Sequence, residues 1–100
     1  MSLDQLQPWL RPWASALVAL VPSARLTSVY RSRAEQQRLY RRYLQGGSSL
    51  PAAPPGHSYH EYGRAWDMVA SDAELRWLGA VWRSWGGTWG GEVDPVHFQA

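Results

Sequence analysis

Hydrophobic residues recur at helical spacing in the part of the chain before Pro22. They lie three or four positions apart, as one face of a helix requires. They are Leu3, Leu6, Trp9, Leu10, Trp13, Leu17 and Leu20. Pro8 and Pro12 interrupt this pattern, and a proline inside a helix removes a backbone hydrogen bond. The pattern therefore predicts either a kinked helix or two short helices at the start of the chain.

Two further helices are predicted where a polar pair precedes an apolar pattern. Ser32 and Glu35 have the spacing of a capping box, and the helix that follows should run over about 33–44, where two glycines come next. Ser71 and Glu74 form a similar pair. The helix after them has apolar residues at spacings of three and four and ends at a second pair of glycines.

Alternating residues predict short strands between these helices. Segments 25–31 and 65–69 alternate in the way that strands do, and 88–89 and 96–99 are predicted as short closing strands. Segment 46–56 is rich in Gly, Ser and Pro, which predicts a flexible loop within one domain. The order of elements indicates an α+β domain over residues 1–100. We expect a small, mainly antiparallel sheet with helices packed on one side.

The composition limits the classes of function. The chain has 100 residues, of which 45% are hydrophobic, so one folded domain is expected rather than a disordered chain. Its ten basic residues are all arginines, they are dispersed, and the net charge is only +2, so we expect no nucleic-acid partner. No apolar run is long enough for a membrane span, and no signal peptide is visible. Because there is no cysteine, any metal ligands must be His and carboxylate.

Three residues that are distant along the chain form a candidate metal-binding set. A catalytic zinc site takes about three His or carboxylate ligands and leaves a further position open for water. His60, Asp67 and His97 supply such a set. Gly63 and the alternation after it suggest a turn into a strand, which would bring His60 back beside Asp67. Taken alone, the same three residues are also compatible with ordinary hydrogen bonding.

Asp94 is a candidate general base for this set. It precedes His97 by three residues, across a turn that contains Pro95. From that position a carboxylate can accept a proton from a water whose pKa a metal ion has lowered. The alternative is that Asp94 only opens the turn, because Asp-Pro pairs are common there.

Arg31 lies where a predicted strand ends and a capped helix begins. A fixed guanidinium there would stabilise an oxyanion or bind a substrate carboxylate through two hydrogen bonds. The alternative is that Arg31 pairs with Glu35, one helical turn later. Gln36, in the first turn of that helix, is expected to face the same opening. Trp89 is expected to flank the cleft, and Glu61 is expected to be exposed to solvent.

Four motifs occur in order between about Thr27 and Gln99. The first is Y-R-S-x-x-x-Q over 30–36, the second is S-x-H-x-x-G-x-A-x-D over 58–67, the third is W-G-G-x-W over 85–89, and the last is D-x-x-H-F over 94–98. Together they resemble the D-alanyl-D-alanine carboxypeptidase-like peptidases, the M15 or LAS family. The D-x-x-H-F form resembles the branch of that family that contains phage endolysins and L-alanyl-D-glutamate endopeptidases.

The resemblance implies a zinc peptidase domain of the LAS or hedgehog type. Its Zn²⁺ ligands would be His60, Asp67 and His97. It also implies that Asp94 is the catalytic base, that Arg31 and Gln36 contact the substrate or its oxyanion, and that Ser58 lines the substrate groove.

The resemblance further implies an activity at the bacterial cell wall. We expect a monomeric enzyme that uses zinc to hydrolyse the stem peptide of peptidoglycan between L-Ala and D-Glu. One alternative is a D-Ala-D-Ala carboxypeptidase. An alternative of another class is a zinc-stabilised binding module without catalysis, as the related hedgehog domains suggest. The presence of a base, an oxyanion residue and three metal ligands in one chain argues against that module.

Overall fold

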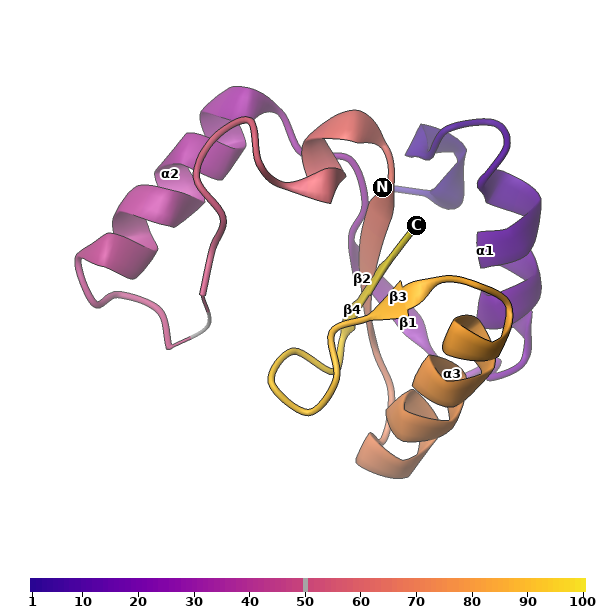
Figure 1. The fold of residues 1–100 in the computed structure, drawn as a ribbon. Coiled ribbons are helices and arrows are strands. Elements are labelled where there is room, and N and C mark those ends of the chain that lie inside the picture. Colours follow the sequence, from indigo (N-terminus) through magenta and orange to yellow (C-terminus); the bar gives the residue numbers. More distant parts are fainter. Residues whose placement is uncertain (50) are drawn as a thin grey trace.

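The computed structural model describes residues 1–49 and 51–100 and is built around a four-stranded antiparallel sheet. The strands are β1 (Arg25–Ser28), β2 (Ala65–Val69), β3 (Thr88–Trp89) and β4 (His97–Gln99). Their order in space is β1-β2-β4-β3, and each neighbouring pair is antiparallel. Strand β4 therefore lies beside β2, so the end of the chain is next to its middle (Figure 1).

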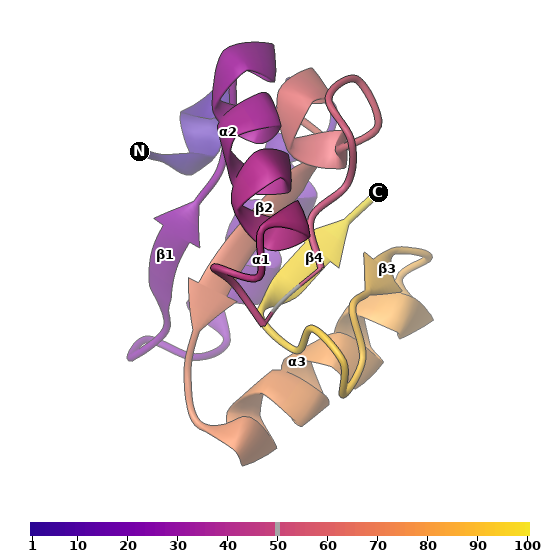
Figure 2. The ribbon, with the colours of Figure 1, turned by 90° about the vertical axis from the view of Figure 1, so that its left-hand side faces the viewer.

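The helices lie on both sides of this sheet. Helices α1 (Arg11–Ala19) and α3 (Asp72–Ser84) cover one face, whereas α2 (Arg33–Leu44) lies over the other (Figures 1 and 2). The expectation that the helices pack on one side is therefore wrong. The physical reason is that α2 has no buried apolar side chain, and its one buried residue is Gln36. It therefore has little apolar surface to contribute to a shared core.

The hydrophobic core fills the space between the sheet and helices α1 and α3. Strand β2 contributes Trp66 and Met68, and β4 contributes Phe98, whose ring stacks on Trp66 with the centroids 5.6 Å apart. Because successive side chains on a strand point to opposite faces, the residues between and beside these core residues face α2. The core thereby orients Asp67 and His97 to the same face of the sheet.

Most of the predicted elements are confirmed. The start of the chain forms two short helices, η1 (Leu3–Gln5) and α1, and the helix predicted over 33–44 has those bounds. The first strand is shorter than the predicted 25–31 because it ends at Ser28. Residues 46–49 and 51–56 form no helix or strand, and Leu50 lies outside the described residues. The flexibility of this segment and the single domain stay predictions. Among the described residues, no helix combines the length and hydrophobicity needed to cross a bilayer.

Candidate metal centre

The sheet and one short turn bring His60, Asp67 and His97 together. Asp67 on β2 pairs in register with His97 on β4. His60 lies in a 3-10 turn, η2 (Tyr59–Tyr62), which ends at Gly63 in the left-handed conformation with φ 65°. That reversal leads the chain into β2 and leaves His60 beside Asp67. The Oδ1 atom of Asp67 lies 3.3 Å from Nε2 of His60 and 3.1 Å from Nδ1 of His97.

The donor atoms of this cluster suit a divalent cation such as Zn²⁺. One ligand atom from each of the three residues lies within 4.8 Å of the others. His60 Nδ1 is 2.7 Å from the carbonyl oxygen of Val29. A carbonyl can only accept, so this nitrogen carries a hydrogen, and in the neutral ring the lone pair of Nε2 faces Asp67. His97 Nε2 is 2.7 Å from Oε1 of Gln99, which turns Nδ1 toward the same carboxylate. In their neutral forms the two imidazoles therefore direct lone pairs at the position beside the Asp67 oxygen, which is where a metal cation would be bound.

The electrostatics of the cluster also favour positive charge between its members. Burial opposes ionisation of Asp67, but hydrogen bonds with His60 and His97 hold the pKa of Asp67 well below its usual range. Burial likewise opposes the charging of His97, yet its bonds to Asp67 and Gln99 raise the pKa of His97. The cluster therefore stabilises a carboxylate anion that attracts protons on the imidazoles or a metal ion.

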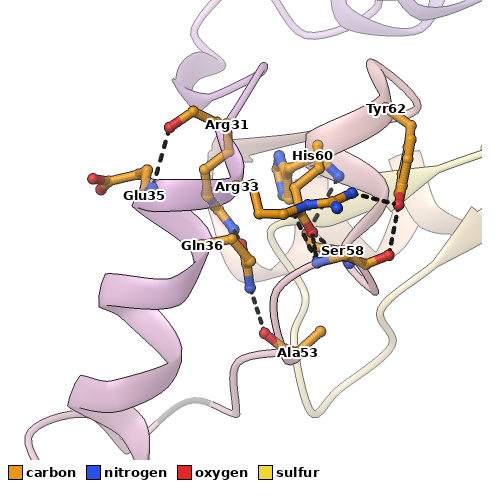
Figure 3. A network of polar contacts seen from close by, with 11 residues as sticks. Arg31, Arg33, Glu35, Gln36, Ala53, Ser58, His60 and Tyr62 are labelled. Atoms are coloured by element: carbon orange, nitrogen blue, oxygen red, sulfur yellow. Dashed lines mark hydrogen bonds and ion pairs between the residues drawn. The ribbon is translucent and has the colours of Figure 1, made fainter.

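Arg31 is held beside this cluster by a network of side chains. Its NH2 group lies 3.6 Å from Oδ2 of Asp67 and donates to Oγ of Ser28 at 3.0 Å. Its NH1 group donates to Oε1 of Gln36 at 2.8 Å, and Nε2 of Gln36 donates to the carbonyl of Ala53 at 2.8 Å (Figure 3). The alternative pairing of Arg31 with Glu35 is not formed, because Glu35 pairs within its own helix. The guanidinium is thus fixed at the metal cluster.

Gln36 lies at the same opening as Arg31, as predicted, but its side chain is almost fully buried. It lines the hollow described below, but it is only 1% exposed and both ends of its amide bind groups of the protein. The amide is therefore already engaged by Arg31 and Ala53. Gln36 also ties α2 to the segment that follows it, because Ala53 lies 17 residues further along the chain.

Asp94 sits in a tight turn that leads into β4. The amide of His97 donates to the carbonyl of Asp94 at 3.1 Å, and the indole Nε1 of Trp89 donates to the carbonyl of Pro95 at 2.7 Å. The backbone of Gly90 packs directly against this turn, because a Cβ at position 90 would lie only 2.1 Å from the Asp94 carbonyl oxygen. A side chain at position 90 would therefore displace the residue proposed as the base.

Trp89 does not flank the cleft as expected. It is 8% exposed, belongs to the hydrophobic core, and is not among the described residues that line the hollow. The absence of a side chain at Gly79 is what admits its ring, since a Cβ at that position would lie 2.2 Å from it. Trp89 contributes to the site only indirectly, because its hydrogen bond to the Pro95 carbonyl holds the turn that carries Asp94.

A hollow of about 520 Å³ opens over the metal cluster. Helix α2 and the segment after it form one side, and residues from β2, β4 and the turn before β4 form the other. Asp94 and Ser58 both line it. Ser58 is nearly buried, and its hydroxyl accepts a hydrogen bond from the amide of His60 at 3.3 Å. Burial, together with the negative charge of Asp67, raises the pKa of Asp94.

Glu61 and Gln99 are site residues that sequence reasoning missed. The side chain of Glu61 is 3% exposed, so the expectation that it is solvated is wrong. Its carboxylate accepts hydrogen bonds from the amides of Gly56 at 2.9 Å and Ser58 at 3.1 Å, and it thereby holds the turn that carries His60. The signal was present, because Ser58 and Glu61 have the same capping-box spacing as the pairs that were recognised. For Gln99, the signal was its position two residues after His97 on a strand.

A small antiparallel sheet that presents a His-Asp-His cluster at the base of an open hollow is typical of metal-dependent hydrolases. The model of the family "VanY: D-alanyl-D-alanine carboxypeptidase" matches residues 14–86, so the chain belongs to this family of peptidases. The matched segment includes His60 and Asp67 and ends before Asp94 and His97. The resemblance inferred from the motifs is confirmed at the level of the family. No curated protein matches the chain significantly.

Solved structures with the same fold include peptidases of different specificity. The D,D-pentapeptidase VanY from a VanB-type resistance cassette, in complex with Zn(II), is 19% identical with a TM-score of 0.71, covering 94% of this chain and 71% of that one. The L-Ala D-Glu endopeptidase ChiX of Serratia marcescens is 23% identical with a TM-score of 0.71, covering 97% and 81%. The LD-carboxypeptidase LdcB is 20% identical with a TM-score of 0.72, covering 99% and 68%. These likenesses confirm the α+β fold.

Proposed function

We propose that this chain is a zinc-dependent peptidase that hydrolyses the stem peptides of peptidoglycan. The observation that carries the proposal is the convergence of ligand atoms from His60, Asp67 and His97 within 4.8 Å of one another, in a chain that belongs to a peptidase family. These three residues would hold the ion. When bound, Zn²⁺ supplies a Lewis acid that polarises a peptide carbonyl and lowers the pKa of a water.

Asp94 is the proposed general base. Its carboxyl lines the hollow on the same side as His97, and its raised pKa suits a group that must take up a proton and release it again. It would accept the proton of the attacking water and return that proton to the leaving amine. Its carbonyl is fixed by the turn into β4, so the position of the side chain relative to His97 is set by the backbone.

Arg31 is the proposed stabiliser of the oxyanion that forms during attack on the peptide carbonyl. Its guanidinium lies within 3.6 Å of Asp67 and is held by Ser28 and Gln36, so little reorganisation is needed when negative charge develops nearby. Gln36 would contribute to substrate binding through Arg31, because both ends of its own amide are engaged. Ser58 would line the substrate groove, and no substrate contact is proposed for Trp89.

For the substrate, we propose cleavage at the cell wall between L-Ala and D-Glu. The D-x-x-H-F form of segment 94–98 supports this choice. A protein of similar fold, ChiX, is named an L-Ala D-Glu endopeptidase. The second candidate is removal of the terminal D-Ala, which is favoured by the family model and by a VanY structure in complex with D-alanine-D-alanine.

The deciding experiment is digestion of purified peptidoglycan by the zinc-loaded protein, followed by mass spectrometry of the soluble products. New amino termini at D-Glu are expected, whereas release of single D-Ala would favour the carboxypeptidase. Matched controls are the chelated protein and Asp94→Asn, which keeps the size of the side chain and removes its basicity. We expect Asp94→Asn to bind zinc and to lose about 10²–10⁴-fold in turnover.

Two outcomes of that digestion would contradict the proposal. Full cleavage after complete removal of metal would show that hydrolysis does not depend on zinc. Tight zinc binding without either product would instead favour a zinc-stabilised binding module.

A further inference from the structure

Gln99 is a polar residue whose position on β4 is fixed from three sides. It pairs in register with Ala65 on β2 and with Thr88 on β3. Its backbone carbonyl also accepts a hydrogen bond from the indole Nε1 of Trp82 at 2.9 Å. The neighbouring Phe98 is buried in the core on the opposite face of the strand. The side chain of Gln99 must therefore lie on the same face as His97.

The amide of Gln99 contacts the ring atom of His97 that points away from the metal cluster. Oε1 of Gln99 lies 2.7 Å from Nε2 of His97, whereas Nδ1 of His97 lies 3.1 Å from Oδ1 of Asp67. A neutral imidazole carries one N–H group. If Nε2 donates to Gln99, Nδ1 is left with a free lone pair. The other tautomer would direct an N–H group at the position where a metal must bind.

His60 needs the opposite tautomer, and the structure provides for it differently. Its Nδ1 faces the carbonyl oxygen of Val29 at 2.7 Å, so that Nε2 is free toward Asp67. The acceptor for His60 is thus a backbone atom that no substitution removes. The acceptor for His97 is a side chain, which makes its contribution open to a direct test.

We propose that Gln99 is a positioning residue that selects the metal-binding tautomer of His97. This inference rests on the proposed metal site. A hydrogen-bond acceptor on the outer nitrogen orients the ring and increases the basicity of the nitrogen that binds the metal, and loss of such partners typically weakens metal binding by about 10–100-fold. An amide achieves this without adding a further negative charge beside Asp67 and Asp94.

The first test measures the zinc affinity of purified variants by competition with a chromogenic chelator. Gln99→Leu removes the acceptor at similar side-chain volume, and Gln99→Glu retains an acceptor. Gln37→Leu makes the same chemical change at an exposed position of α2 and is the matched control. We expect Gln99→Leu to bind zinc about 10–100-fold more weakly than the wild type. We expect Gln99→Glu and Gln37→Leu to bind at least as tightly as the wild type.

The second test reads the tautomer directly from long-range ¹H–¹⁵N spectra of the histidine rings in the metal-free wild type, at a pH where both rings are neutral, so that no bound ion dictates the tautomer. His97 should carry its hydrogen on Nε2 and His60 on Nδ1, so that each ring serves as the reference for the other. This measurement requires no variant, so it remains decisive if Gln99→Leu does not fold.

Specific results would overturn the inference. One is a folded Gln99→Leu variant with wild-type zinc affinity, and another is a wild-type His97 that carries its hydrogen on Nδ1. In either case zinc binding and peptide cleavage by the wild type would stand, so the failure would concern Gln99 alone. A wild type that binds no zinc would instead overturn this inference together with the metal site.

Discussion

The buried amide of Gln36 offers a sharp test of how the structure holds Arg31. Gln36→Met replaces the amide by an apolar group of similar length, so the space stays filled while both hydrogen bonds are lost. The wild-type residue is 1% exposed and links Arg31 to the carbonyl of Ala53. We expect the variant to be less stable and to hold the guanidinium less rigidly.

The magnitude follows from the two bonds that disappear. The bond from Arg31 is charge-assisted, and such bonds contribute about 1.5–3 kcal/mol. The bond to Ala53 is neutral, and because Ala53 is partly exposed, water can replace it, so about 0.5 kcal/mol is appropriate. Arg31 keeps its contacts with Ser28 and Asp67. Together these terms predict a loss of about 2–3.5 kcal/mol, which lowers Tm by roughly 8–28 °C for a domain of this size.

The assay is thermal and chemical unfolding of the metal-free proteins, followed by circular dichroism. Gln37→Met is the matched control, because Gln37 is the exposed neighbour on the same helix. It should change the free energy of unfolding by less than about 0.5 kcal/mol. If Gln36→Met were no less stable than Gln37→Met, the two hydrogen bonds would make no net contribution and the reasoning would be refuted.

Three further substitutions test the local supports of the site. Glu61→Gln should cost about 1–3 kcal/mol at pH 7, because an amide cannot accept all the N–H groups that the carboxylate accepts. Burial acts to raise the pKa of Glu61, but its hydrogen bonds with Gly56, Ser58 and Arg33 have the larger combined effect, so the pKa of Glu61 lies below its usual value. The stabilisation is therefore complete above the unfolded pKa of about 4.3 and is lost as pH falls, so the Tm values of the two proteins should converge below about pH 4. Gly90→Ala should weaken both zinc binding and cleavage, because its Cβ would collide with the Asp94 carbonyl, and a zinc titration equal to wild type would contradict this. Trp89→Phe should lower the free energy of unfolding by about 1 kcal/mol through the lost bond to Pro95, and unchanged urea melts would disprove it.

Local sequence signals accounted for most of the helices and strands. Ser32 and Ser71 accept hydrogen bonds from the amides of Glu35 and Glu74, as the capping pattern predicted, and those bonds span only three residues. The alternation over 65–69 placed Asp67 on the face opposite the core for the same reason, because strand periodicity depends on adjacent residues alone. Motif order also identified the three residues that the fold brings together.

The sequence by itself therefore determined the elements, the family and the identity of the clustered residues. Only the tertiary structure decided that α2 lies on the opposite face of the sheet, that Gln36 is buried, that Trp89 belongs to the core and that Gln99 contacts His97. The physical reason is separation along the chain. Caps and strand alternation act over a few residues, whereas the contact of Gln36 with Ala53 spans 17 residues and depends on how the complete chain packs.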